Sequence, residues 1–198
     1  MSKYPAQAFD NVPPSVAPIS GVRGAIDSIV QGALVDLFAA YGVALAPLPR
    51  AALERAPALA EVSAAVGFTL RGNGRSSGQA GRLTLSMPGL VLERMKGADG
   101  MVRTSLQGDW ARELANQLTG RIKNRLLPFS VRLELGVSSS IDGQALSRGL
   151  RVASSLRVYS ARTLRGEVVL ALEGMPDDSE LSYVGGAHTA TEGDAILF

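Results

Sequence analysis

The sequence predicts an α+β fold, in which two long helices pack on one mixed or antiparallel sheet. Two long segments repeat apolar residues at intervals of three and four, which is the helical pattern. Two pairs of shorter segments, rich in Val, Leu and Thr, are typical of β-hairpins. The two halves repeat this order with an offset of about 85 residues, which is too long for a solenoid. We therefore expect two copies of one α–β unit, sharing one sheet with the helices on one face.

Composition limits the classes of function. The chain has 198 residues, 46% of them apolar, so it is long enough for one sizeable core. Its net charge of +2 gives no whole-molecule attraction to nucleic acid. The absence of cysteine excludes disulfides and thiolate metal sites. No apolar signal segment opens the sequence, and the longest apolar run, near 33–47, is interrupted by Asp36. We predict a cytoplasmic protein without membrane insertion or nucleic-acid binding.

The sequence predicts one folded domain between two less ordered ends. Residues 1–20 hold four prolines and no helical period, so they are predicted to be an extended or disordered lead. Residues 21–173 are predicted to form the domain. Residues 174–198 carry a proline, paired acids and several glycines, and are predicted to be a poorly structured tail.

The elements of the domain follow from local patterns. The first helix is expected over 21–43, with Gly42 as its stop, and a loop over 44–57 because of its prolines. Pro88 is expected to open a short helix over 89–95. Strands are expected in two hairpins and after the second long helix, over residues 61–71, 81–87, 131–137, 150–159 and 167–172, with the second hairpin turning near 161–166.

The second long helix, expected over 104–127, organises the chain. Thr104 and Gln107 have capping-box spacing, and Pro128 cannot continue a helix. One apolar stripe comprises Ala111, Leu114, Ala115, Leu118, Ile122 and Leu126. At about 100° per residue, four residues gather on the opposite face. These are Asp109, Glu113, Asn116 and Gly120. The helix is therefore expected to bury one side and to present carboxylates and an amide on the other.

The spacing Asp109-x3-Glu113-x2-Asn116 resembles the signature helix of the CheC/CheX family, phosphatases that act on the phosphorylated receiver CheY. Residues 81–88 resemble the strand that precedes a short helix in CheX-like proteins, and residues 131–143 resemble the strand that follows the signature helix; the likeness covers roughly 22–173. It implies a pseudo-twofold α-β-β-β repeat. One departure is that the family proline, 23 residues after the asparagine, is Ser139 here.

The resemblance implies a chemotaxis-type hydrolase in two-component signalling. Asn116 would orient the water that attacks the receiver's aspartyl phosphate, and Glu113 would pair with the receiver's lysine. Asp109 would assist docking, and Gly120 would let the partner backbone come close. The protein would need no cofactor of its own, because the receiver carries Mg²⁺. The family resemblance also permits a homodimer.

A binding or scaffold module of the same fold, without catalysis, is the alternative. Ser139 in place of proline favours it, and so does the first helix, whose equivalent face offers Asp27, Gln31 and Leu34. Other motifs have simpler interpretations. The glycine-rich stretch 71–78 lies between strands and is expected to be a turn. His188 is alone and is expected to be surface decoration, and Trp110 is expected at the core boundary.

The second hairpin is basic, and an acidic receiver could dock on a basic surface. Alternate residues of a strand point to opposite faces, so its arginines cannot form one patch. A charged, solvated sheet edge is the simpler interpretation. The arginines concerned are Arg148, Arg151, Arg157, Arg162 and Arg165.

Overall fold

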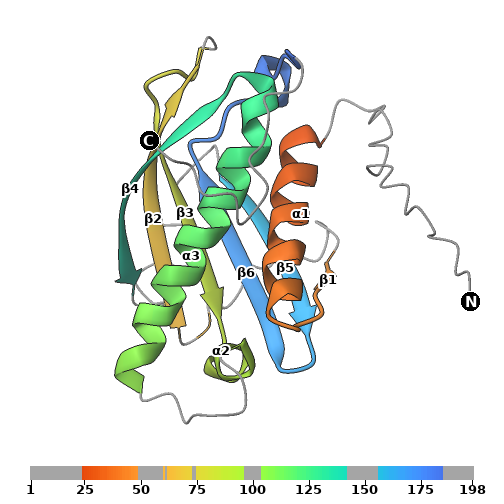
Figure 1. Ribbon diagram of the computed structural model, residues 1–198, viewed down its shortest axis with the longest axis vertical. Coiled ribbons are helices and arrows are strands. Elements are labelled where there is room, and N and C mark those ends of the chain that lie inside the picture. Colours follow the sequence, from red (N-terminus) through yellow and green to blue (C-terminus); the bar gives the residue numbers. More distant parts are fainter. Residues whose placement is uncertain are drawn as a thin grey trace, which may run out of the picture.

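Strands in the described part of the chain form one antiparallel sheet of six, and two long helices lie across one of its faces (Figure 1). The computed structural model describes residues 24–48, 60, 62–72, 75–95, 104–141 and 156–184. The helices are α1 (Ala25–Ala40), α2 (Gly89–Met95), α3 (Thr104–Leu126), and the short 3₁₀ turns η2 (Leu127–Phe129) and η3 (Asp178–Glu180). The strands are β1 (Ala46–Pro47), β2 (Val62–Arg71), β3 (Ala80–Met87), β4 (Arg132–Ile141), β5 (Arg157–Thr163) and β6 (Gly166–Glu173).

The sheet order confirms the predicted internal repeat. The strands run β1-β5-β6-β3-β2-β4, and every pairing is antiparallel. If β1, β2 and β3 are exchanged with β4, β5 and β6, the same order is read from the opposite edge. Each half therefore contributes one helix and three strands. The strand after each long helix pairs with the hairpin of the other half, so neither half is complete alone.

The long helices form because their apolar stripes are buried between helix and sheet. All six residues predicted for the stripe of α3 are fully buried, and the buried stripe of α1 includes Ile26, Val30, Leu37 and Phe38. The helices run antiparallel (Figure 1), since Arg125 near the end of α3 contacts the Ile29 carbonyl in the first half of α1, whereas Gln117 in the middle of α3 bonds to Tyr41 at the end of α1. Within the described residues, no helix is both long and apolar enough to cross a membrane.

A β-bulge in β4 changes which of its side chains face α3. Val66 pairs with Ser138 and Phe68 with Leu135, so Gly67 alone lies opposite two residues of β4. An extra residue in one strand reverses the alternation of its side chains. Leu133 before the bulge is buried in the core, whereas Ser138 after it reaches α3. Without the bulge, strict alternation would turn the even-numbered serines away from the helix.

Two boundaries differ from the sequence prediction. Residues 46–47 were expected in a loop but form β1, which pairs with Arg162 and Ala161 at the sheet edge. An edge position tolerates Pro47, which has no N–H to donate. The second hairpin turns at residues 164–165, within the predicted 161–166, but its strands reach further into that stretch because pairing continues to Thr163 and Gly166. Residues 49–57 and 150–155 lie outside the described residues.

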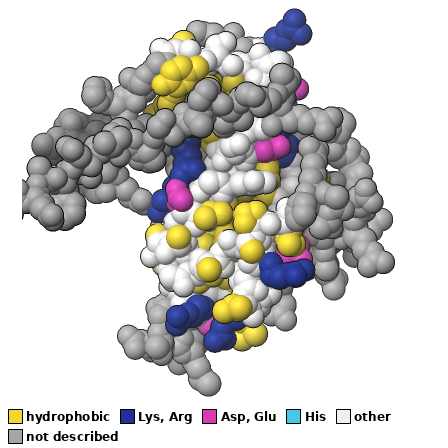
Figure 2. Space-filling view, turned by 90° about the vertical axis from the view of Figure 1, so that its right-hand side faces the viewer, with side chains coloured by type: hydrophobic (Ala, Val, Ile, Leu, Met, Phe, Trp, Pro, Cys, Tyr) yellow, Lys and Arg dark blue, Asp and Glu magenta, His cyan; other side chains and the backbone are white. Residues whose placement is uncertain are grey.

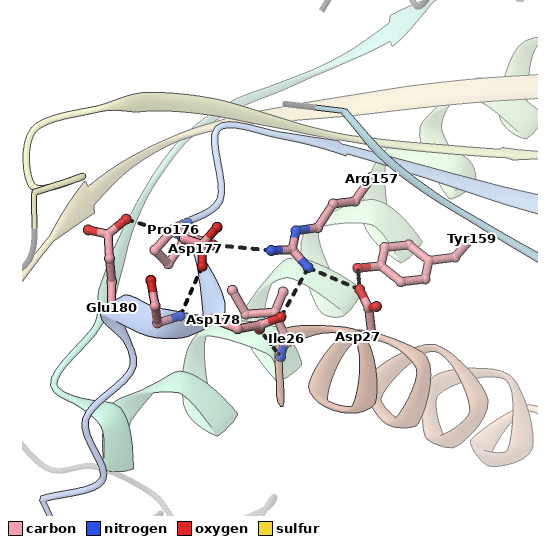
Figure 3. A network of polar contacts seen from close by, with 9 residues as sticks. Ile26, Asp27, Arg157, Tyr159, Pro176, Asp177, Asp178 and Glu180 are labelled. Atoms are coloured by element: carbon pink, nitrogen blue, oxygen red, sulfur yellow. Dashed lines mark hydrogen bonds and ion pairs between the residues drawn. The ribbon is translucent and has the colours of Figure 1, made fainter. Parts of the chain in front are cut away.

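Residues 174–184, predicted to belong to a poorly structured tail, hold the 3₁₀ turn η3 and a contact to α1. There Asp177 caps η3 by a capping box, and the Asp178 carboxylate accepts a hydrogen bond of 3.0 Å from the Ile26 N–H of α1 (Figure 3). The first N–H groups of a helix lack internal partners, and Gly24 provides no capping side chain. A carboxylate distant in sequence therefore caps α1, and the paired acids are structural. Residues 185–198 lie outside the described residues.

Because of the Glu180 carboxylate in η3, we expect the free energy of unfolding to fall in acid. The Glu180 carboxylate accepts hydrogen bonds from the Ser76 hydroxyl and N–H at 2.8 and 3.0 Å, and these bonds lower the Glu180 pKa below its usual value of 4.5. A lowered pKa in the folded state means that stabilisation is present above about pH 4.5 and is lost as pH falls. We expect Glu180→Gln to reduce the fall in unfolding free energy between pH 5 and pH 3, measured by urea denaturation at each pH.

Candidate functional site on the exposed face of helix α3

The four predicted site residues all lie on the exposed side of α3. Asp109 and Glu113 are exposed, and Asn116 and Gly120 are partly exposed. The opposite side of the same turns is fully buried, including Leu114. The 3.6-residue period of the helix therefore separates the polar residues from the core as the sequence predicts.

Asn116 is held by the strand beside it. Its Nδ2 donates a hydrogen bond of 3.2 Å to Ser138 Oγ on β4. Within the described part of the chain, the Asn116 Oδ1 accepts no hydrogen bond. Among the described residues, the amide thus has one bonded end and an oxygen with both lone pairs available.

Glu113 is held from the other flank. Its carboxylate accepts a hydrogen bond of 2.9 Å from Gln117 Nε2, and Gln117 Oε1 accepts one of 2.9 Å from the Tyr41 hydroxyl. The Tyr41 ring packs edge-on against Trp110, with 5.7 Å between the ring centroids. Since α1 and β4 lie on opposite sides of α3 (Figure 1), these bonds draw Glu113 and Asn116 towards opposite flanks of one face.

Asp109 and Gly120 mark the two ends of this face. Asp109 forms an ion pair with Arg112, one helical turn away. An exposed ion pair of this kind contributes about 0.2–1 kcal/mol, so a partner can displace it at little cost. At Gly120 an added Cβ would meet no atom within 4 Å, and the helix surface there is open. The face therefore offers little steric resistance to an approaching partner.

The equivalent face of α1 is occupied by structural contacts. The Asp27 carboxylate accepts hydrogen bonds from the Tyr159 hydroxyl at 2.7 Å and from Arg157 Nη1 at 3.1 Å (Figure 3). Burial and the bond to Asp27 raise the pKa of Tyr159 well above its usual value of 10.0. Leu34 is buried at 2% exposure, while Gln31 is exposed. The first half therefore presents no second copy of the α3 face.

The α3 face is an open surface. A cavity of about 280 Å³ lies at the C-terminal end of α3 and is lined by Phe129 and Glu180 among others, but by neither Glu113 nor Asn116. Another of about 190 Å³ is lined by Arg94 and Leu164 among others. Figure 2 shows another side of the molecule, the side on which α1 lies in Figure 1, and there basic and hydrophobic side chains gather at the lower end. Small-molecule sites are concave, so an open face suits a macromolecular partner.

The described residues contain no cluster of acidic side chains, cysteine or histidine suited to a metal.

Several other predicted residues can now be placed. Trp110 is partly buried and packs against the core, as predicted. In the stretch 71–78, Arg71 ends β2 and residues 75–78 form a turn before β3, as expected; residues 73–74 lie outside the described residues. Arg157 is not on a solvated edge: it is ion-paired with Asp27 and Asp178. Arg148, Arg151 and His188 lie outside the described residues.

Sequence reasoning did not find the residues that hold the site. Gln117 lies four residues after Glu113, a spacing at which helical side chains interact, so that signal was present. Tyr41 is 76 residues from Gln117, and Ser138 depends on the bulge. Neither has a local sequence signal.

Comparison with known proteins identifies the fold. No protein-family model matches the chain, and no curated protein sequence matches it. Solved structures do match. The chemotaxis protein CheX from Desulfovibrio desulfuricans is 18% identical over 74% of this chain and 97% of its own, with a TM-score of 0.56.

Two further structures agree with that result. CheX from Vibrio vulnificus is 15% identical over 78% of this chain and 99% of its own, with a TM-score of 0.57. A CheC-like superfamily protein from Shewanella sp. PV-4 is 15% identical over 75% of this chain and 96% of its own, with a TM-score of 0.57. The chain therefore has the CheX/CheC-like fold, which the resemblance of its second long helix and flanking strands predicted.

Proposed function

We propose that this protein hydrolyses the aspartyl phosphate of a CheY-like receiver domain in a chemotaxis-type signalling pathway. The observation that carries the proposal is the amide of Asn116, which lies on the open face of α3 with its Oδ1 unengaged within the described residues. The fold, shared with structures described as chemotaxis protein CheX, supports it.

The proposed reaction needs positioning more than covalent help. An aspartyl phosphate is an activated acyl phosphate, and the receiver supplies Mg²⁺ and a lysine beside it. The water oxygen attacks phosphorus, the bond from phosphorus to the aspartyl oxygen breaks, and free carboxylate and inorganic phosphate result. Asn116 Oδ1 accepts a hydrogen bond from the attacking water and holds it in line with the breaking bond. The bond to Ser138 fixes the amide while it does so.

The other residues of the face have docking roles in the proposal. Glu113 pairs with the lysine of the receiver and so aligns the two proteins. Gly120, with open space above it, admits the partner backbone. Asp109 exchanges its ion pair with Arg112 for contacts to the partner. These roles place all four predicted residues in one interface without a metal bound by this chain.

The test uses receiver domains from the same genome, phosphorylated with acetyl phosphate. After the phosphodonor is removed, the wild-type protein is expected to accelerate loss of phosphate above the receiver's own rate. Receiver binding is measured separately, by titration of a labelled receiver. Binding without acceleration would reject the phosphatase and select the scaffold alternative. Ser139 also favours that alternative: it stands where the family has proline, and in β4 it pairs with Ala65 of β2.

A further inference from the structure

We infer that Gln117 and Tyr41 are positioning residues for Glu113, and that they set its carboxylate in the orientation that receives the lysine of the partner. The inference rests on the proposed function and assigns a role to two residues outside the sequence motif. It starts from the chain of hydrogen bonds that runs from the Tyr41 hydroxyl through the Gln117 amide to the Glu113 carboxylate.

The direction of this chain follows from its acidic end. An ionised carboxylate only accepts hydrogen bonds, so the Gln117 nitrogen must face Glu113. The Gln117 oxygen then faces Tyr41, and the Tyr41 hydroxyl must donate. Each group has one arrangement that satisfies its neighbours. The network therefore fixes the orientation of the Gln117 amide. Through that amide it also fixes the position of the Glu113 oxygen that accepts the hydrogen bond.

Tyr41 is a firm anchor for the network. It is the C-cap residue of α1, and its N–H bonds to the Phe38 carbonyl at 3.0 Å. Its ring is partly buried and packs edge-on against Trp110. The anchor thus belongs to the first half of the fold, while Glu113 belongs to the second. This gives α1 a part in positioning a residue of the α3 face.

The advantage for docking is a reduced entropic cost. Glu113 is exposed, and a free glutamate loses rotamer freedom when it pairs with a lysine. The bond from Gln117 engages Oε1 and, within the described residues, leaves Oε2 without a partner. The side chain is held before the partner arrives, with one oxygen ready for the lysine. A loss of this ordering should weaken association with the receiver.

The test compares Tyr41→Phe and Gln117→Met with the wild type in the dephosphorylation assay. Tyr41→Phe removes one hydroxyl and keeps the ring on Trp110, and Gln117→Met keeps the length of the side chain. Each is expected to raise KM for the phosphorylated receiver about fivefold, the scale of one net hydrogen bond, with kcat within twofold. A purely structural effect would lower the active fraction, and so the apparent kcat, without moving KM.

The chain offers a matched control in Tyr159→Phe. This change also removes a hydroxyl that donates to a carboxylate, but the acceptor is Asp27 on α1, away from Glu113. It is expected to lower stability and leave KM unchanged. In a Glu113→Gln background, Gln117→Met should add less than a twofold change, since its effect acts through the carboxylate.

The outcomes separate this inference from the proposed function. An unchanged KM and dissociation constant in Tyr41→Phe and Gln117→Met, with the wild type active, would overturn the inference alone. If the wild type binds the phosphorylated receiver without accelerating phosphate loss, the phosphatase proposal fails. In that case a fivefold weaker dissociation constant in the two variants would still support the positioning of Glu113.

Discussion

Asn116→Ala is expected to lower kcat for receiver dephosphorylation about 100-fold, while receiver binding stays within twofold of the wild type. A group that positions a reacting water, or stabilises developing charge, typically contributes a factor of 10²–10³ or more. The alanine variant keeps Glu113 and its supporting bonds, so the docking contacts remain. The loss should therefore fall on kcat and leave KM nearly unchanged, which is the signature of an interaction made only in the transition state.

A second amide on the same helix provides the control. Asn124 lies two turns after Asn116, is exposed, and has no assigned role in the site. Asn124→Ala should leave both kcat and KM unchanged. Circular dichroism and a urea titration of both variants would show that the fold is intact. The proposed role of Asn116 would be contradicted if its replacement weakened binding and left kcat of the bound complex unchanged.

Asn116→Asp tests the contribution of the amide itself. The change keeps an oxygen that can accept a hydrogen bond from water but removes the Nδ2 donor to Ser138. It also adds a negative charge facing a phosphoryl group, which is repelled. We therefore expect the aspartate variant to be no more active than the alanine variant, measured in the same assay.

The fold was predictable where burial imposes a period on the sequence. The apolar stripe of α3 from Ala111 to Leu126 is fully buried, so packing requires apolar residues at helical intervals, and this period is visible in the sequence. The two-residue strand β1 has no such period, and only its partner β5 defines it. The contacts of residues 174–184 have a related explanation. The carboxylate of Asp178 accepts a hydrogen bond from Ile26, which lies 152 residues earlier in the first turn of α1, and a separation of that length leaves no local pattern in the sequence.

The candidate site divides in the same way. Asp109, Glu113 and Asn116 share one helix, so their common face follows from spacing alone. Ser138 faces Asn116 only because a bulge opposite Gly67 reverses the alternation of β4, and composition does not reveal that bulge. Residues on one element were thus predictable, and the contacts between elements required the structure.

Gly81→Ala is expected to be the most destabilising small substitution in the sheet, at roughly 3 kcal/mol of unfolding free energy or more. A Cβ on Gly81 would lie 2.2 and 2.3 Å from two ring carbons of Phe68 and 2.7 Å from the Glu173 carbonyl oxygen. The Phe68 side chain is 4% exposed and belongs to the core, so its ring has no free space to enter. The carbonyl belongs to β6 and cannot move without disturbing the pairing of β3 with β6.

Because of the position of Phe68, we expect the Gly81→Ala substitution to disturb the candidate site as well. Phe68 pairs with Gly81 on one side and with Leu135, the last β4 residue before the bulge, on the other. A ring displaced by the new methyl group would press on the strand segment that aims Ser138 at Asn116. We expect the folded fraction of Gly81→Ala to show a lowered kcat as well as a lowered midpoint in urea.

Gly67→Ala is the matched control, because Gly67 lies on the strand next to Gly81 and a Cβ there would meet nothing within 4 Å. Gly67 has no positive φ, so alanine is not strained there and restricts the unfolded chain. Its unfolding free energy should lie within about 0.5 kcal/mol of the wild type. Urea denaturation of both variants, with equal m-values, measures the difference. Equal midpoints for the two variants would mean that the Phe68 ring can rotate away, and that the close packing of β3 on Phe68 does not require glycine.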